Sequence, residues 1–156
     1  MLTKQQLGYV FENHIHQIIT LTYYPVLTEK EIVNKYSRLS FGIDHLIYLP
    51  DYIICIQDKW RDTKSPLSDI NHFIKCVENI YIRENYKKCI GIYLSKMPIT
   101  EGAQQSFSFE NSKGLCYFIS LHDEYINRLI NKLTNLFYSN NIFFYEPDGS
   151  AIMNCS

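Results

Sequence analysis

Two stretches of the 156-residue chain carry side chains that suit metal-assisted chemistry on a phosphate. Asp44 offers a carboxylate, and the run Gln57-Asp58-Lys59 begins 13 positions later. A carboxylate, an amide oxygen and a backbone carbonyl are the hard oxygen ligands that Mg²⁺ prefers. A metal held in this way polarises a phosphate and lowers the pKa of an attacking water, while a neighbouring lysine orients that water or stabilises the developing charge. These residue types therefore favour phosphodiester hydrolysis.

The elements that must position these side chains form a predicted hairpin. Two β-rich runs, residues 39–49 and 52–60, flank Leu49-Pro50-Asp51, and Pro followed by Asp is typical of a turn. A turn centred between the Pro and the Asp places Asp44 directly opposite Gln57. Directly opposed residues share one face of a sheet, with Cβ atoms about 4.5–5.5 Å apart.

Side-chain alternation then sorts the polar residues onto two faces. Gln57 and Lys59 should point to the face of Asp44, and Asp58 to the other face. His45 also points away from the face of Asp44, so we leave it out of the predicted site. A slip of one residue in the pairing would separate the predicted site residues.

The sequence around this hairpin resembles the active site of the PD-(D/E)XK nuclease superfamily. The resemblance rests on Gly42-Ile43-Asp44 and on Ile54–Trp60, and it extends over about residues 5–95. The form with Gln in place of the acidic residue is similar to Mrr-like restriction enzymes and, more loosely, to archaeal Holliday-junction resolvases. Those families also carry an acidic residue on a preceding helix, and Glu12 occupies the matching place.

The resemblance implies a role for each matched residue. Asp44, Gln57 and the backbone carbonyl of Asp58 would bind the metal, which would be Mg²⁺ or Mn²⁺. Lys59 would serve the nucleophile, and Glu12 would bind a second metal or a metal-bound water. The chain departs from the pattern at Ile43, where the superfamily has Pro, and at Gln57, which carries no charge.

The implied function is a metal-dependent endonuclease that cuts DNA and acts as a homodimer. Two alternatives stay open. One is a catalytically weakened module of the same fold that binds nucleic acid or a partner protein. The other is an unrelated α/β interaction protein, in which Asp44 is a solvated strand end and Glu12 an ordinary exposed helix acid.

Apolar periodicity predicts the remaining elements. Helices are expected over about residues 3–22, from Ser65-Pro66 onward with Ser as the cap, and over about 122–138; strands are expected at Cys89–Ser95 and Leu115–Ser120, a loop at 98–112, and an edge strand at Ile142–Tyr145. The order α-β-β-α-β-β-α-β predicts an α/β fold, a mixed sheet flanked by helices, and the resemblance implies that it is restriction endonuclease-like. We treat residues 1–156 as one domain with a core at about 3–138.

Composition narrows the class of protein. The net charge of −1 and the pI of about 6.5 exclude a purely electrostatic nucleic-acid binder. The five cysteines form no CxxC pair and are expected to be buried thiols in a reducing compartment. No signal-peptide core and no apolar run of about 18 residues is present. An intracellular protein with no membrane contact is expected.

Several other polar and aromatic residues have weaker interpretations. Trp60 and Arg61 could contact nucleic acid, but a half-buried Trp that closes the core is favoured. His14 and His16 are expected to pack or to lie at the surface. Candidate phosphate contacts are Lys64, Lys87, Lys88 and Lys96.

Overall fold

A mixed five-stranded sheet, with strand order β1-β2-β3-β4-β5, organises the protein. The computed structural model describes residues 1–22, 24–37 and 42–142. In chain order the elements are α1 (Lys4–Ile19), β1 (Val26–Thr28), α2 (Glu29–Tyr36), β2 (His45–Tyr48), β3 (Ile53–Lys59), α3 (Leu67–Arg83), β4 (Cys89–Ser95), α4 (Glu101–Lys113), β5 (Cys116–His122) and α5 (Ile126–Ser139). The predicted class, a mixed α/β sheet flanked by helices, is confirmed.

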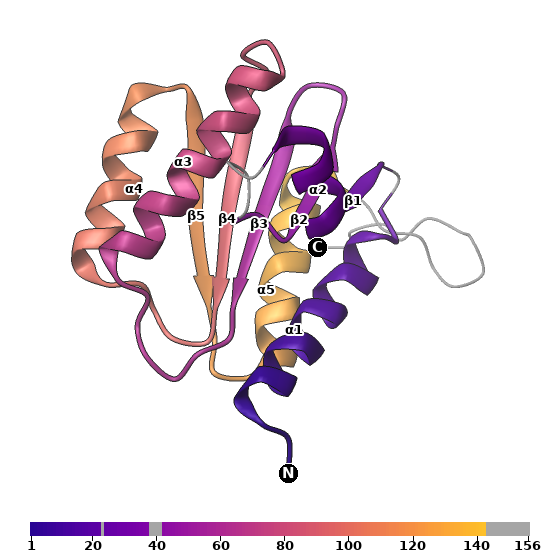
Figure 1. Cartoon of the computed structure of the whole chain (residues 1–156), viewed down its shortest axis with the longest axis vertical. Coiled ribbons are helices and arrows are strands. Elements are labelled where there is room, and N and C mark those ends of the chain that lie inside the picture. Colours follow the sequence, from indigo (N-terminus) through magenta and orange to yellow (C-terminus); the bar gives the residue numbers. More distant parts are fainter. Residues whose placement is uncertain (23, 38–41, 143–156) are drawn as a thin grey trace.

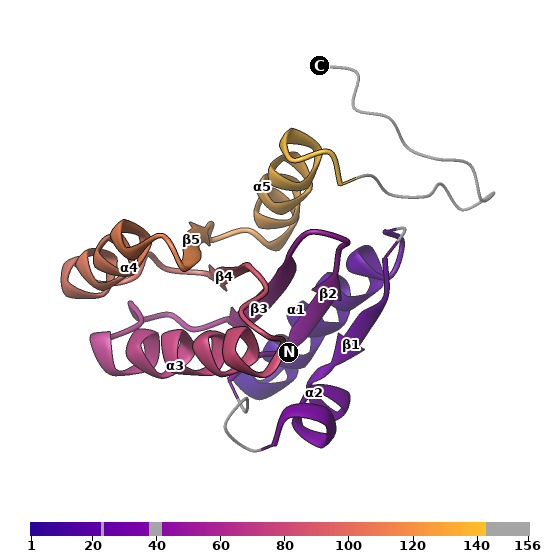
Figure 2. The ribbon, with the colours of Figure 1, turned by 90° about the horizontal axis from the view of Figure 1, so that it is seen from above.

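The sheet changes from antiparallel to parallel at β3. β1 and β2 pair antiparallel and so do β2 and β3, whereas β4 and β5 continue parallel to β3 through the crossover helices α3 and α4. The carboxyl ends of β3, β4 and β5 therefore lie at the same end of the sheet (Figure 1). Figure 2 shows α3 and α5 on opposite sides of the strands.

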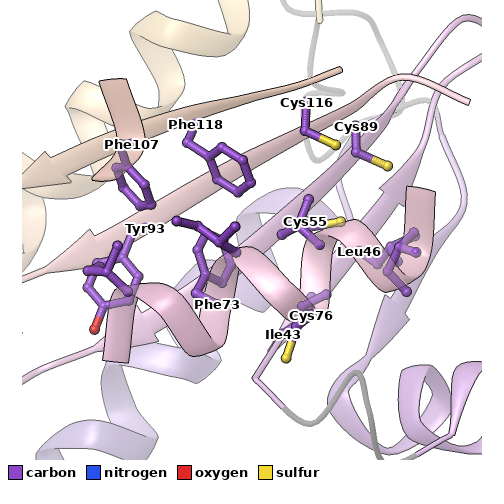
Figure 3. Packing of buried hydrophobic residues seen from close by; sticks show 14 of the residues in the cluster. Ile43, Leu46, Cys55, Phe73, Cys76, Cys89, Tyr93, Phe107, Cys116 and Phe118 are labelled. Atoms are coloured by element: carbon purple, nitrogen blue, oxygen red, sulfur yellow. The ribbon is translucent and has the colours of Figure 1, made fainter. Parts of the chain in front are cut away.

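Each face of the sheet packs against its own set of helices. Residues of α2, α3 and α4 form one apolar cluster with the sheet, and residues of α1 and α5 form the other. Alternation along β3 divides its apolar residues between them, so that Cys55 faces the first cluster and Ile54 and Ile56 face the second. The first cluster also contains the aromatic rings shown in Figure 3.

One glycine is required by this packing. A Cβ atom at Gly91 would lie 2.7 Å from Cδ1 of Phe118, a distance that side-chain packing does not tolerate. Gly91 on β4 thereby leaves room for the ring of Phe118.

The predicted hairpin register is confirmed. His45 pairs with Ile56 and Tyr48 pairs with Ile53, which is the alignment expected from a turn centred between Pro50 and Asp51. The N–H of Asp44 donates to the carbonyl of Ile56 at 2.8 Å, so both Asp44 and His45 lie opposite Ile56 where the β2–β3 ladder ends. The predicted bounds of β4 are confirmed as well.

The expectation of a loop at residues 98–112 is wrong, because α4 occupies most of this stretch. Thr100 caps the helix by accepting from the N–H of Ala103 at 3.3 Å, and Gly114 ends it in the left-handed conformation at φ 75°. Among the residues of α4, the buried ones are Ala103 and Phe107. The helix therefore lacks the wide apolar stripe by which amphipathic helices are recognised.

Two further elements, β1 and α2, lie in a stretch to which no structure was assigned. The side chain of Thr28 accepts from the N–H of Glu31, and the side chain of Glu31 accepts from the N–H of Thr28. This reciprocal capping box starts α2. The observed order is consequently α-β-α-β-β-α-β-α-β-α rather than the shorter predicted order.

The predicted ends of some elements also differ. Ser65 does not cap α3; Pro66 is the N-cap residue, and the Ser65 hydroxyl accepts from the hydroxyl of Tyr93 at 2.8 Å instead. The last helix begins at Ile126 rather than 122, because β5 runs on to His122. Of the predicted edge strand, residues 143–145 lie outside the described residues.

Two predictions from composition can also be compared with the structure. Four cysteines in the described residues are free buried thiols, as expected: Cys55, Cys76, Cys89 and Cys116. No helix in the described ranges combines the length and the apolar character that crossing a bilayer requires.

Candidate metal centre

Asp44 and Gln57 meet at the carboxyl end of β3, where both side chains are buried. Asp44 is 8% exposed and Gln57 is 6% exposed. Nε2 of Gln57 donates to Oδ2 of Asp44 at 2.9 Å, and the backbone N–H of Asp58 donates to the same oxygen at 2.7 Å. The structure thus brings together the two residues that the hairpin register placed opposite each other. It does not show the separation of Asp44 from Gln57 that would favour an unrelated interaction protein.

Two further carboxyl groups, those of Glu12 and Glu29, stand beside this pair. Carboxylate oxygens of Glu12, Glu29 and Asp44 all lie within 4.8 Å of one another. Glu12, the predicted helix acid, comes from α1, and Glu29 is the first residue of α2. Side-chain oxygens at such separations suit a divalent cation, which draws carboxylates together.

Sequence reasoning missed Glu29. Thr28 and Glu31 form a capping-box pattern that could have placed Glu29 in the first turn of a helix. Nothing local in the sequence would have placed that turn next to Asp44, because the contact depends on how α2 packs against the sheet. The predicted site therefore left out one of the three carboxylates that converge here.

The electrostatics of the cluster fit a cation. Burial, the charge of Asp58 and a hydrogen bond with Glu29 hold the pKa of Asp44 well above its usual range. Burial and the charge of Asp58 also raise the pKa of Glu12, although His45 opposes this. Grouped like charges raise carboxyl pKa values because each ionisation repels the next. A bound cation would remove this repulsion, so the donor set is chemically suited to a metal.

Gln57 presents its amide nitrogen, not its oxygen, to the carboxylate. Nε2 donates to Asp44 and, at 3.3 Å, also to the backbone carbonyl of Asp58. The two ends of an amide are assigned from their hydrogen-bond partners. A half-turn of the amide would direct the oxygen towards Asp44, and this turn is needed if Gln57 is to be a metal ligand.

Two solved structures are similar to this chain. One is a crystal structure of a repair endonuclease from Pyrococcus abyssi, and the other is the structure of an EndoMS–dsDNA2 complex. Each has a TM-score of 0.48 and 17% sequence identity over 78% of this chain, and the match covers 48% and 46% of those chains, respectively. This chain therefore spans just under half the length of each. No family profile and no curated protein matches the sequence.

Three hollows border the carboxylates: one of about 260 Å³ has Glu12, Asp44 and Lys59 in its lining, and the two others both include Glu29. Of these two, one, of about 310 Å³, is lined by Glu29, Gly42, Asp44, Gln57, Lys59, Asp69, His72 and Tyr93. The other, of about 540 Å³, lies between α1 and α2 and is lined by Tyr9, Glu12, Thr28, Glu29, Lys30, Val33 and Asn34. A substrate could therefore approach the cluster from either side of α2.

Lys59 lies in the hollow of about 310 Å³, next to Asp44 and Gln57. Its ammonium group forms no ion pair or hydrogen bond within the part of the chain that the structure describes. It is therefore available to a substrate. The roles of Glu12, Asp44, Gln57, Asp58 and Lys59 as ligands or catalysts remain predictions.

The side chains of Asp58 and His45 lie on the face of β3 opposite to that of Gln57, which is the face against which α1, the helix of Glu12, packs. Nε2 of His45 is hydrogen-bonded to Oδ2 of Asp58, and the ring of His16 stacks on His45 with centroids 5.9 Å apart. Burial lowers the pKa of His45, but the carboxylate of Asp58 outweighs it, and the net shift is upward. Alternation along β3 thus placed the side chain of Asp58 correctly, and only its backbone faces Asp44.

Three residues near this site, Trp60, Arg61 and Lys96, contact other parts of the protein. The ring of Trp60 lies 4.8 Å from that of Phe11 and closes the second cluster, as favoured from the sequence. Arg61 forms an ion pair with Asp69 at 2.9 Å. Lys96 pairs with Asp62 and lies 5.9 Å from the ring centroid of Trp60.

Proposed function

We propose that this chain is a metal-dependent endonuclease that hydrolyses phosphodiester bonds of DNA. One observation carries the proposal: the carboxylates of Glu12, Glu29 and Asp44 converge beside a lysine that has no protein partner within the described residues. Asp44 is buried next to two partly exposed carboxylates, and grouped like charges of this kind destabilise a fold, so the arrangement is explained by chemistry rather than by stability.

The residues present fit a divalent cation, Mg²⁺ or Mn²⁺. Asp44, Glu29 and Glu12 would hold it, with the amide of Gln57 and the carbonyl of Asp58 as further donors. When bound, the cation would polarise the phosphate and lower the pKa of the attacking water.

The protein groups have separate tasks in this reaction. Asp44 would bind the cation as a carboxylate, and the N–H of Asp58 would keep that carboxylate oriented. The ammonium of Lys59 would orient the attacking water or stabilise the charge on the phosphate oxygens.

The test is incubation of the purified protein with linear, nicked, branched and single-stranded DNA, with and without Mn²⁺. We expect metal-dependent cleavage that Asp44→Ala and Lys59→Ala each abolish while circular dichroism stays unchanged. Asp51→Ala and Lys113→Ala are matched controls, because they remove the same side chains outside the cluster. Unfolding of the Asp44 or Lys59 variant would instead mean that the residue is structural.

A catalytically weakened module that binds nucleic acid or a partner protein is the second candidate. Gln57 favours it, because this residue lowers the charge available to a metal and its nitrogen already satisfies Asp44. Calorimetric titration with Mn²⁺ separates the two functions. Saturable binding that Asp44→Ala removes supports the nuclease, and no binding even with DNA present supports the module.

The nuclease is also proposed to act as a homodimer. Two strands of a duplex need two cuts, and a single cluster of this kind serves one. Closed two-fold pairing is the commonest assembly of soluble proteins. Sedimentation velocity should show a dimer, and a fully active monomer at every concentration would contradict this.

A further inference from the structure

The hydrogen bond between His45 and Asp58 joins two strands at a point where their backbone ladder has ended. The last ladder pair of β2 and β3 is His45 with Ile56. Beyond it, β3 continues for three residues that pair only with β4 on their other side. On the β2 side, side chains take the place of the missing ladder: Asp44 accepts from the N–H of Asp58, and His45 bonds to the carboxylate of Asp58.

The two side chains have little freedom to rearrange. The side chain of His45 is 1% exposed and that of Asp58 is 3% exposed. Nε2 of His45 is the donor of this bond when the carboxyl group of Asp58 is ionised, because an ionised carboxylate can only accept. Nδ1 of His45 and Oδ1 of Asp58 are buried and have no partner among the described residues. Their mutual hydrogen bond is therefore the one that each side chain makes in this part of the chain, and its loss would leave a buried group unsatisfied.

The backbone of Asp58 contacts Asp44 and Gln57, even though its side chain lies on the other face of β3 and contacts His45. Its N–H orients Oδ2 of Asp44, and its carbonyl accepts from Gln57. Rotation of this residue would move both groups together. The hydrogen bond from His45 that fixes the side chain of Asp58 therefore also fixes its N–H and its carbonyl.

We propose that His45 is a positioning residue of the metal centre, which through Asp58 holds the carboxylate of Asp44 and the carbonyl of Asp58 in place. The role rests on the proposed function, since it assumes that these donors bind a metal. Outer groups that orient metal ligands typically contribute about 10- to 100-fold to metal affinity.

The experiment compares His45→Phe with His16→Phe. The two rings stack on each other, and both variants keep an aromatic ring, but only the first removes the hydrogen bond to Asp58. We expect His45→Phe to weaken Mn²⁺ binding about 10- to 100-fold by calorimetry, and to reduce the rise in melting temperature that Mn²⁺ causes relative to EDTA. His16→Phe should bind Mn²⁺ as the parent does.

Two further variants separate the hydrogen bond from packing. His45→Gln offers an amide N–H near the place of Nε2 and should recover most of the lost affinity. If His45→Phe does not fold, the double variant His45→Phe/Asp58→Leu replaces the buried pair with apolar groups, a change that folds tolerate. It should melt normally in EDTA and still bind Mn²⁺ weakly.

Asp44→Ala distinguishes the two ways of failing. If Asp44→Ala loses Mn²⁺ binding while His45→Phe or the double variant binds as the parent does, the positioning role is overturned and the metal centre stands. If Asp44→Ala itself binds Mn²⁺ like the parent, the metal centre is refuted, and the role of His45 falls with it.

Discussion

Residues 53–56 of β3 and the next two residues, Gln57 and Asp58, all have buried side chains, but the two parts of the strand differ in what they contact. Residues 53–56 are all apolar and fill the two clusters on either face of the sheet. Gln57 and Asp58, the next two residues, are almost as inaccessible, yet they place an amide and a carboxylate beside Asp44. The strand thus changes from apolar packing at Ile56 to polar contacts with Asp44 at Gln57, the next residue.

The difference shows where the fold gives up stability. The apolar half gains free energy from burial, at about 25 cal/mol per Å². The polar half gathers carboxylates whose pKa values are raised by burial and by each other. Local conflict of this kind is expected at functional sites, where a protein sacrifices stability for activity.

Replacing the central carboxylate should give the largest effect. Asp44→Asn keeps an oxygen that accepts from Gln57 and Asp58 but removes the negative charge. Cleavage should fall by about 1000-fold, as it does when one preorganised electrostatic group is lost. Stability in EDTA should rise by about 1 kcal/mol, because repulsion within the cluster is relieved. Urea denaturation and a cleavage assay measure both, and a less stable variant would contradict the interpretation of the cluster.

The apolar half should respond in the opposite sense. Ile54 is buried in the apolar cluster that the sheet forms with α1 and α5. Ile54→Ala should therefore destabilise the fold by about 2–5 kcal/mol. Below the melting temperature, cleavage per folded molecule should stay near the parent value. A fall in cleavage as large as that of Asp44→Asn would mean that the two halves are not independent.

The apolar half is also the part that could be predicted from sequence. A continuous apolar run, a turn at Pro50-Asp51 and strict alternation were sufficient for the register, and hence for the contact of Asp44 with Gln57. These signals are local, because each depends on residues that are neighbours along one hairpin. The strand β4 was predicted for the same reason.

The missing parts depend on contacts between distant segments. Glu29 reaches Asp44 only because α2 packs beside the sheet, and α4 buries too few residues to show a helical period. His45 was excluded because it faces away from Asp44, which is correct. Its bond to Asp58 is proposed to act on Asp44 through the backbone of Asp58. A pattern of side chains along the sequence cannot predict an effect that passes through the backbone.

Gln57 permits a graded test at the border between the two halves. Gln57→Glu restores a carboxylate of nearly the same length and should tighten Mn²⁺ binding by about 10-fold, whereas Gln57→Ala should weaken it by a similar factor. Without metal, Gln57→Glu should be less stable than the parent protein, because it adds a further negative charge to the cluster. Activity of the parent should favour Mn²⁺ over Mg²⁺. Equal affinities in calorimetric titrations of all three proteins would exclude Gln57 as a ligand and support the binding module.

The smallest effect is expected at Asn111, a polar residue that serves the fold alone. β5 is an edge strand of the sheet, and the amide of Asn111 both accepts from the N–H of Phe118 at 2.6 Å and donates to its carbonyl at 3.0 Å. The side chain thereby acts as a one-residue substitute for a neighbouring strand and blocks pairing at this edge.

Asn111→Ala should lower stability by about 1 kcal/mol, the usual net value of such hydrogen bonds, and should leave Mn²⁺ affinity unchanged, because both of its partners are backbone groups remote from the carboxylates. Ser112→Ala, an exposed neighbour on the same helix, is the control. Urea denaturation gives the stability, and sedimentation at rising concentration detects pairing through the freed edge. If Asn111→Ala weakened metal binding as much as Gln57→Ala, polar groups of the fold and of the site would be energetically coupled, and the division of this sheet into a structural and a chemical part would be wrong.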